Sequence, residues 1–167
     1  MRYVIFRYFN VAGADPECEV GEFHKPETHL IPLLLKAASG KHEELTIFGT
    51  DWDTPDGTCI RDYIHVWDLV DAHIMGLQWL TESSKNEVFN LGTGIGFSVR
   101  EVVECIKRVT GQCVTTVNGD KRQGDCSKLV SGSTKTNTLL RWTASHSDLD
   151  QMVIDAWRWQ NHGGYAE

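Results

Sequence analysis

Residues 54–66 gather several ionisable side chains around a turn that is followed by a strand. The Pro-Asp-Gly run at 55–57 is typical of a turn, because proline fixes φ, aspartate bonds its own backbone and glycine tolerates positive φ. Apolar and polar residues alternate enough at 60–66 to predict a short strand. Arg61 is the best candidate for binding an anion, since its guanidinium can donate two hydrogen bonds to phosphate oxygens. The alternative is an Arg61–Asp62 turn in solvent that binds no ligand.

A second candidate for anion binding is the charged run at 121–125. Arg122 stands three residues before Asp125, and an arginine can hold a phosphate while an aspartate accepts from sugar hydroxyls. This pairing suits a nucleotide sugar, and a diphosphate needs two or more cationic donors, which Arg61 and Arg122 would supply. A solvated charged loop is the alternative interpretation.

The glycines at 92–96 follow a predicted strand and precede a predicted helix, which is where a dinucleotide-binding loop would lie. Their spacing is Gly-x-Gly-x-Gly rather than Gly-x-Gly-x-x-Gly, and Gln112 stands where a ribose-binding acid is expected. We therefore expect these glycines to form a tight connection between strand and helix.

The remaining polar residues predict neither a catalytic centre nor a metal site. His65 and His73 lie on apolar faces and are predicted to be core histidines, while the other five histidines show no metal-ligand spacing. The sequence has no Gly-x-Ser-x-Gly or Cys–His signature of a nucleophile. None of the tyrosines at 3, 8 and 63 is followed four places on by a lysine.

These candidates need strands and helices to position them, and the apolar pattern predicts an alternation of the two. Strands are expected at 3–9, 45–49, 60–66, 87–91 and 113–117, and residues 10–28 are expected to form a loop. Helices are expected at 30–39, after a cap at Asp68, and at 98–109, 133–140 and 148–160. The class is therefore α/β, and the irregular middle of the chain suggests that not all strands share one sheet.

Composition excludes several classes of protein. The chain has 167 residues, 41% of them hydrophobic, which is enough for the core of about one domain. Its net charge is −7 with scattered lysines and arginines, which argues against nucleic acid or a membrane surface as a partner. No apolar run approaches the ~20 residues that span a bilayer, and the first residues lack a signal-peptide pattern. Five cysteines without a Cys-x-x-Cys pair predict reduced thiols in a cytoplasmic protein.

The apolar run at 3–9 is unusual for the beginning of a domain, because such continuous strands lie inside parallel sheets. No element precedes this run, so we expect the chain to begin in mid-fold. Such a chain would leave apolar surface exposed and would tend to associate.

Several motifs, in a fixed order, resemble those of the UDP-glucose 4-epimerases of the extended short-chain dehydrogenase/reductase family. They are Arg-Tyr-Phe-Asn-Val-Ala-Gly-Ala at 7–14, His-Leu-Ile-Pro at 29–32, Leu-Thr-Ile-Phe-Gly at 45–49, the whole of 54–66, and Phe-Asn-Leu-Gly at 89–92. The resemblance runs from residue 3 to the last helix and covers about the C-terminal half of the family's length.

This resemblance implies an isomerase that interconverts UDP-glucose and UDP-galactose with NAD, through a 4-keto sugar. In the family, the N-terminal Rossmann half supplies the dinucleotide loop, the catalytic Tyr-x-x-x-Lys pair and the helices of the homodimer. Residues 1–167 would then be a single C-terminal fragment, a UDP-sugar-binding domain with residual Rossmann strands near 3–9 and 87–91 and without the N-terminal Rossmann core. No catalytic residue would lie in this chain, which alone would be inactive.

The resemblance also implies which residues contact the ligands. The substrate-binding positions would be Asn10, His29, Leu30, Thr46, Ile47, Phe48, Arg61, Arg122, Asp125 and Leu129. The two arginines would clamp the diphosphate, Asp125 would accept from the ribose, and residues 46–48 would receive the uracil. Phe9 would lie near the nicotinamide end of NAD. Relatives vary in side-chain size at Leu129, which tunes their acceptance of N-acetylated sugars, and leucine leaves that specificity open.

Two alternatives to this function stay open. One is another UDP-sugar epimerase or a dehydratase of the same family, although the motifs at 29–32 and 46–48 favour the UDP-glucose type. The other is a module that binds a UDP-sugar without chemistry.

Overall fold

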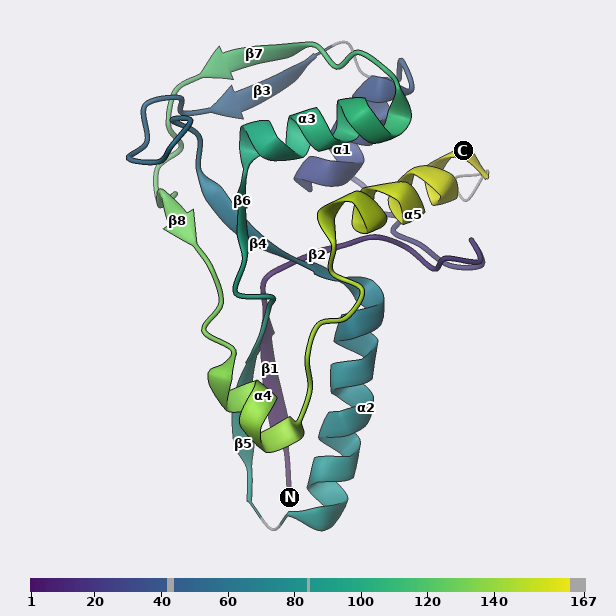
Figure 1. The fold of residues 1–167 in the computed structure, drawn as a ribbon, viewed down its shortest axis with the longest axis vertical. Coiled ribbons are helices and arrows are strands. Elements are labelled where there is room, and N and C mark those ends of the chain that lie inside the picture. Colours follow the sequence, from purple (N-terminus) through teal and green to yellow (C-terminus); the bar gives the residue numbers. More distant parts are fainter. Residues whose placement is uncertain (42–43, 84, 163–167) are drawn as a thin grey trace.

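A computed structural model describes residues 1–41, 44–83 and 85–162 of the chain (Figure 1). Its elements follow one another in the order β1 (Val4–Tyr8), β2 (Asn10–Ala12), α1 (Leu30–Ala38), β3 (Leu45–Phe48), β4 (Ile60–His65), α2 (Val66–Glu82), β5 (Glu87–Leu91), β6 (Gly96–Ser98), α3 (Val99–Thr110), β7 (Thr116–Gly119), β8 (Lys128–Leu129), α4 (Thr134–Leu140) and α5 (Leu149–Asn161). Strands and helices alternate, which confirms the predicted α/β class.

The described strands form separate sheets, as the irregular middle of the sequence indicated. β1 and β5 pair in parallel, from Val4 opposite Glu87 to Tyr8 opposite Leu91. β4 lies between β2, with which it is parallel, and β6, with which it is antiparallel, and it also pairs with β8. β3 and β7 make a parallel pair of their own. β4 is therefore the strand that joins β2, β6 and β8 into one sheet.

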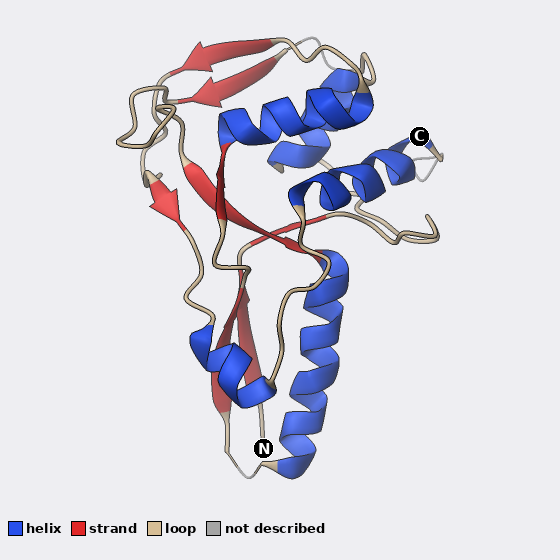
Figure 2. Cartoon of the chain, in the orientation of Figure 1, coloured by secondary structure: helices blue, strands red, loops and turns tan. Residues whose placement is uncertain are grey.

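Two apolar cores hold the elongated molecule together (Figure 2). In the upper part of Figures 1 and 2, α1, α3 and α5 pack on one another through residues such as Leu34, Ile106 and Met152. In the lower part, α2 and α4 lie beside the β1–β5 pair, around Phe89 and Trp142. The cavity described below opens where β2 and β4 cross between these two parts.

Local sequence signals explain the ends of the helices that border the cavity. Ser98 caps α3 by accepting from the backbone N–H of Glu101, whose carboxylate accepts from the N–H of Ser98 in return. Gly111 ends α3 in the left-handed conformation, and Pro32 lies in the first turn of α1, where no hydrogen bond is lost. These features match the predictions from the sequence.

The sequence predicted that Asp68 caps α2, and this prediction was wrong. This helix begins at Val66, and its cap is His65, whose Nδ1 accepts from the N–H of Trp67 at 3.0 Å. Asp68 lies inside the first turn instead, fully buried, where its carboxylate accepts from the backbone N–H groups of Ser145 and His146. His73 was also misplaced, because it lies on the exposed face of α2 rather than in the core.

Short strands account for the other differences. Residues 10–12 were expected in a loop but extend beside β4, and β6 and β8 were not foreseen because each has three residues or fewer. The strand expected at 113–117 begins at Thr116, where its pairing with β3 starts. Such strands carry too few residues for an apolar pattern and exist because β4 or β3 offers them hydrogen-bonding partners.

All five cysteines are free thiols, in agreement with the expected reduced state. In the described part of the chain, α2 is the longest helix, and neither it nor any other helix is both long and apolar enough to cross a membrane.

Candidate functional site

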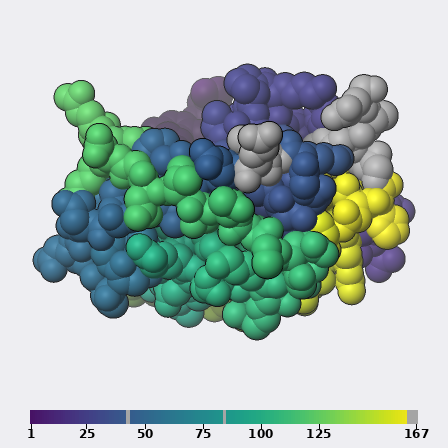
Figure 3. Space-filling model, turned by 90° about the horizontal axis from the view of Figure 1, so that it is seen from above, coloured from purple at the N-terminus to yellow at the C-terminus, as the bar shows by residue number. Residues whose placement is uncertain are grey.

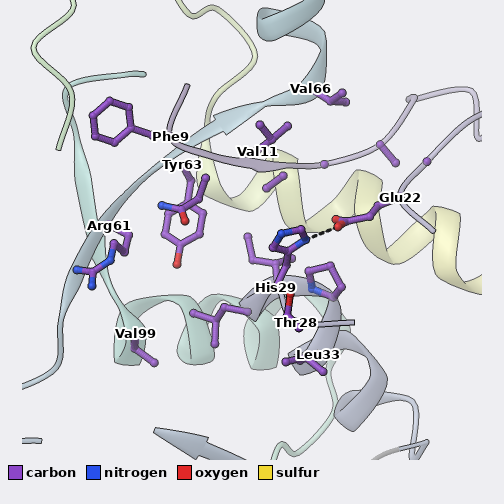
Figure 4. Close-up of a pocket in the computed structure, with 18 of the residues that line it drawn as sticks. Phe9, Val11, Glu22, Thr28, His29, Leu33, Arg61, Tyr63, Val66 and Val99 are labelled. Atoms are coloured by element: carbon purple, nitrogen blue, oxygen red, sulfur yellow. Dashed lines mark hydrogen bonds and ion pairs between the residues drawn. The ribbon is translucent and has the colours of Figure 1, made fainter. Parts of the chain in front are cut away.

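A cavity of about 1090 Å³ lies between β2, β4, the start of α1 and β3 (Figure 4). Its walls come from residues 8–15, 20–22, 28–33 and 44–48, and from single residues of β4, α2, α3 and the loop before β8. In Figure 4, Arg61 and His29 lie on opposite sides of the cavity with Tyr63 between them. Nine of the eleven residues predicted to bind substrate or cofactor line this cavity, and Asp125 and Leu129 are the two that do not.

Strand periodicity decides which residues of β4 face the cavity. Side chains alternate between the two faces of a strand, and Cys59, Arg61 and Tyr63 line the cavity while the residue between the last two points away. Asp62 is fully buried on the other face. It accepts from the backbone N–H groups of Thr93, Gly94 and Ser131 at 2.9 to 3.0 Å.

The contacts of Asp62 explain the glycine loop at 92–96. Its carboxylate accepts from the backbone N–H groups that would have to donate to a phosphate bound by this loop. A Cβ at Gly92 would lie 2.8 Å from the Oδ2 atom of Asp62. The loop links β5 to β6 and α3, as predicted for a tight connection between strand and helix.

Arg61 is positioned by backbone carbonyls. Its side chain is 15% exposed, and Nη1 donates to the carbonyls of Ile60 and Cys126, both at 2.9 Å. Nη2 lies 3.7 Å from the Asp125 carboxylate. A guanidinium fixed by its own strand and by the loop before β8 is preorganised for a ligand, because little side-chain freedom remains to be lost.

Arg122 reaches the same carboxylate from the loop before β8. Its Nε donates to Asp125 Oδ2 at 2.9 Å, and its guanidinium lies 4.8 Å from the centre of the Phe48 ring. The structure thus brings together Arg61, Arg122, Asp125 and Phe48, which lie up to 77 positions apart in the sequence. Two cations and one aromatic face meet at this side of the cavity. We call these four residues the arginine cluster.

The space-filling view shows the chain segments next to this cluster at one end of the molecule. Residues near 50 (blue) and 125–130 (light green) gather there, opposite α5 (yellow) in Figure 3. The Lys121 ammonium lies 3.0 Å from the Asp51 carboxylate and over the Trp52 ring, so an ion pair joins the loop after β3 to the loop after β7.

Asn10 and Phe9 form the middle of the cavity wall. Asn10 lies opposite Tyr63 in the β2–β4 register, and its Nδ2 donates to the carbonyl of Asp62 at 2.8 Å, which fixes the amide plane. Phe9 is half-buried beside it. Tyr63 is 4% exposed, and burial raises the pKa of its phenol, so Tyr63 stays protonated over the ordinary pH range.

His29 and Leu30 form the opposite wall, at the start of α1. His29 is the cap residue of this helix, and its exposed ring makes a contact of 2.5 Å between Nδ1 and Glu22 Oε1. Leu30 is half-buried and packs on the upper core.

β3 contributes the remaining predicted residues. Thr46, Ile47 and Phe48 pair with β7 along one edge of the strand. No described strand pairs with the other edge of β3, and the Phe48 carbonyl accepts from Trp52 Nε1 at 3.3 Å. Leu129 lies opposite Arg61 in the β4–β8 register and is 48% exposed, so it stands beside the arginine cluster without lining the cavity.

Several lining residues were missed by sequence reasoning. Glu22 lies in a polar loop without a recognisable motif, and no motif includes Trp67. Trp67 is 42% exposed in the first turn of α2, an exposure that only the structure reveals.

The turn at 54–58 is a rigid support for β4 rather than a ligand site. Asp56 accepts from the N–H and the hydroxyl of Thr58 and from the hydroxyl of Ser98. Burial acts to raise the pKa of Asp56, but the hydrogen bonds from Ser98 and Thr58 outweigh burial and lower this pKa. Gly57 has φ of +80°, and a Cβ there would meet the Thr50 carbonyl oxygen at 2.2 Å. The predicted turn chemistry at 55–57 is therefore confirmed.

Fold and site together define an α/β protein with a large, mainly apolar cavity whose cationic end suits an anionic ligand. The model of the "NAD dependent epimerase/dehydratase family" matches residues 1–92, and the chain belongs to this family. The chain is 46% identical, over 99% of its length, to a UDP-glucose 4-epimerase of Halalkalibacterium halodurans, of which it covers 50%.

Solved structures give the same family. A UDP-glucose 4-epimerase from Brucella ovis in complex with NAD matches with a TM-score of 0.91 and 46% identity, over 95% of this chain and 49% of that one. The enzyme from Bifidobacterium longum in complex with NAD+ and UDP matches with a TM-score of 0.91 and 34% identity, over 98% of this chain and 48% of that one. The chain thus spans about half the length of the relatives it matches.

Proposed function

We propose that this chain is the UDP-sugar-binding part of a UDP-glucose 4-epimerase, which interconverts UDP-glucose and UDP-galactose. The arginine cluster is the observation that carries this proposal. Two guanidiniums on one side of the cavity would neutralise a diphosphate, and the aromatic face of Phe48 lies next to them. The names of the relatives agree with this substrate.

Each part of the substrate would find a partner in the cavity. Arg61 and Arg122 would donate to the diphosphate, and Asp125, which now holds both, would also accept from the ribose hydroxyls. The uracil would lie on Phe48 and beside Ile47, and it would bond the backbone of Thr46 at the edge of β3 that faces away from β7. Leu129, next to this end, would limit the room left for the substrate.

The hexose would lie toward the opposite wall. Asn10 would bond its hydroxyls through the amide that the Asp62 carbonyl orients, and His29 and Leu30 would close the far side. An amide that the protein already orients through its Nδ2 group loses less entropy when it binds a ligand than a free one would.

The described residues fit NAD at one point. Phe9 presents a half-buried aromatic ring to the cavity beside Asn10, where a nicotinamide would find an apolar contact. The glycine loop does not fit a dinucleotide, because Asp62 already holds its amides. NAD supplies the acceptor for the C4 hydride in such enzymes, and the rest of its site would lie outside this chain.

We further propose that the chain corresponds to the C-terminal half of the enzyme. The order of the motifs supports this, as do the apolar side chains of Ile5 on β1 and Leu77 on α2, which are 47% and 67% exposed. The runs at 3–9 and 87–91 would be Rossmann strands, and the Tyr-x-x-x-Lys pair and the dimer helices would belong to the other half. On this proposal the 167-residue chain alone does not epimerise, and the complete enzyme works in the cytoplasm.

Calorimetric titration of the chain with UDP and with uridine tests the site. The Arg61→Ala variant is expected to bind UDP about 2 kcal/mol more weakly, on the scale of a lost charge-assisted hydrogen bond, and uridine almost unchanged. Arg108→Ala is the matched control, because Arg108 is an exposed arginine on α3 that pairs with Asp150 away from the cavity.

Three results of this titration would count against the proposal. They are equal UDP affinities of Arg61→Ala and the wild type, an equal loss in Arg108→Ala, and the absence of any UDP binding by a folded chain.

A further inference from the structure

The segment from 22 to 29 gathers two histidines and two glutamates beside the cavity. The residues are Glu22, His24, Glu27 and His29, and each offers one ligand atom, all of them within 4.8 Å of one another. The histidines show no metal-ligand spacing in the sequence, and it is the fold that brings them close to the two glutamates. Because the segment turns back on itself before α1, side chains two to seven positions apart converge.

The two distances from Glu27 to the histidines resemble those between ligand atoms around a tetrahedral ion. Nδ1 of His24 lies 3.7 Å, and Nδ1 of His29 lies 3.5 Å, from Glu27 Oε1. Neighbouring ligand atoms around tetrahedral Zn²⁺ are about 3.4 Å apart, since zinc–nitrogen and zinc–oxygen bonds are about 2.0–2.1 Å long. The two imidazole rings stack at 5.2 Å between their centres, which aims both Nδ1 atoms at the same carboxylate.

Glu27 supplies an independent indication of a missing ligand. Its side chain is only 3% exposed, and Oε1 accepts from the backbone N–H groups of Thr28 and His29. Oε2 is buried and has no hydrogen-bond partner among the described residues. A buried carboxylate oxygen without a partner is costly, and a cation beside it would remove that cost. In the described part of the chain, Glu27 has only histidines as ion-pair partners.

We propose that Glu22, His24, Glu27 and His29 bind one divalent transition-metal ion of the Zn²⁺ class at the rim of the cavity. Imidazole nitrogen and carboxylate oxygen are ligands that Zn²⁺ accepts, whereas Mg²⁺ and Ca²⁺ prefer oxygen alone. The ion would draw Nδ1 of His29 away from its short contact with Glu22. This site does not depend on the identity of the substrate.

A second group, of Asp68, Asp71 and His146, does not share these properties. The Asp68 carboxylate already accepts from the backbone and side chains of residues 145–147, and those hydrogen bonds lower its pKa although burial opposes the shift. We therefore place the ion at the first group.

Titration of the full chain with Co²⁺, followed by visible absorption, tests the site. We expect d–d bands that saturate at one equivalent, disappear on addition of Zn²⁺ and come without a thiolate charge-transfer band. His24→Ala and Glu27→Gln should weaken Co²⁺ binding at least about tenfold, because even partners outside the ligand set cost that much. His73→Ala, which removes an exposed histidine on α2, should bind Co²⁺ like the wild type.

Glu27→Gln keeps an oxygen that can accept from the N–H groups of Thr28 and His29, and His24 is 47% exposed, so both variants should fold, as circular dichroism can check. The proposal would be overturned by an absence of d–d bands, by a thiolate band, or by a loss of binding in His146→Ala but not in His24→Ala.

Discussion

β4 assigns a different task to each of its polar residues. Arg61 faces the cavity, Asp62 holds the glycine loop on the other face, and His65 ends the strand by capping α2. The sequence assigned only Arg61 to a ligand and predicted a core position for His65, which is 1% exposed. The sequence paired Arg61 with Arg122, but it could not show that both guanidiniums lie against the Asp125 carboxylate, because this contact depends on how the loop before β8 folds.

His65 makes the stability of the chain depend on pH. It is 1% exposed, and burial lowers its pKa from 6.5, although hydrogen bonding and charge attraction from Asp155, and the charge of Asp68, act in the opposite direction. Nδ1 accepts from the N–H of Trp67, so Nε2 carries the proton that points to Asp155 Oδ2 at 3.3 Å. A second proton would have to enter at Nδ1 and would remove the cap of α2.

The sign of the effect follows from the lowered pKa. Between the folded pKa and 6.5 the unfolded chain binds more protons than the folded one, so the free energy of unfolding falls as the pH drops through this window. We expect urea unfolding from about pH 7.5 to about pH 5.5 to show this loss, and His65→Asn, which keeps an acceptor for Trp67, to lose less. The same pH dependence in both proteins would contradict this role of His65.

At the scale of elements, helices were predictable from the sequence and short strands were not. α1, α3 and α5 carry an apolar face over nine residues or more, and their caps and glycines mark their ends. β2, β6 and β8 have three residues or fewer and depend on β4 for their hydrogen bonds. The sequence thus predicted Asn10 as a binding residue but did not predict the strand on which it lies.

The cap of α3 connects this helix to the turn that supports β4. Ser98 accepts from the N–H of Glu101 and donates to Asp56, so Ser98→Ala should lower the free energy of unfolding by about 1–2 kcal/mol. Ser133→Ala is the matched control, because Ser133 precedes α4 without a capping bond from its side chain, and should change it by less than about 0.5 kcal/mol. Urea unfolding of both variants checks the difference, and equal losses would show that the capping bond is not what stabilises α3.

At the scale of the molecule, one face carries unusually many exposed apolar side chains. Trp67, Val70, Ile74 and Leu77 follow one another along α2 at helical spacing and are 42–67% exposed. Within the described residues β1 pairs with β5 alone, so its other edge is open. On our proposal, a further part of the enzyme would cover this face. Without that part, the face should bind other copies of the chain.

The chain by itself should therefore associate. Sedimentation velocity is expected to show a weight-average mass above the 18.8 kDa of a single chain, and Leu77→Glu should bring it down by charging the most exposed position of the face. Leu139→Glu is the control, since Leu139 is a comparably apolar residue, 41% exposed, on α4. A wild-type chain that stays monomeric, or an equal effect of both substitutions, would argue against an adhesive α2 face.

The central claim is that the cavity holds a UDP-sugar with its diphosphate at the arginine cluster. Amide chemical-shift mapping of the labelled chain during a titration with UDP tests it most directly, because it reports where the ligand lies. We predict the largest shifts at residues 46–48, at Arg61 and at Arg122, with the glycine loop at 92–96 almost unchanged. Shifts concentrated in that glycine loop, or an absence of shifts along the cavity wall, would contradict the claim.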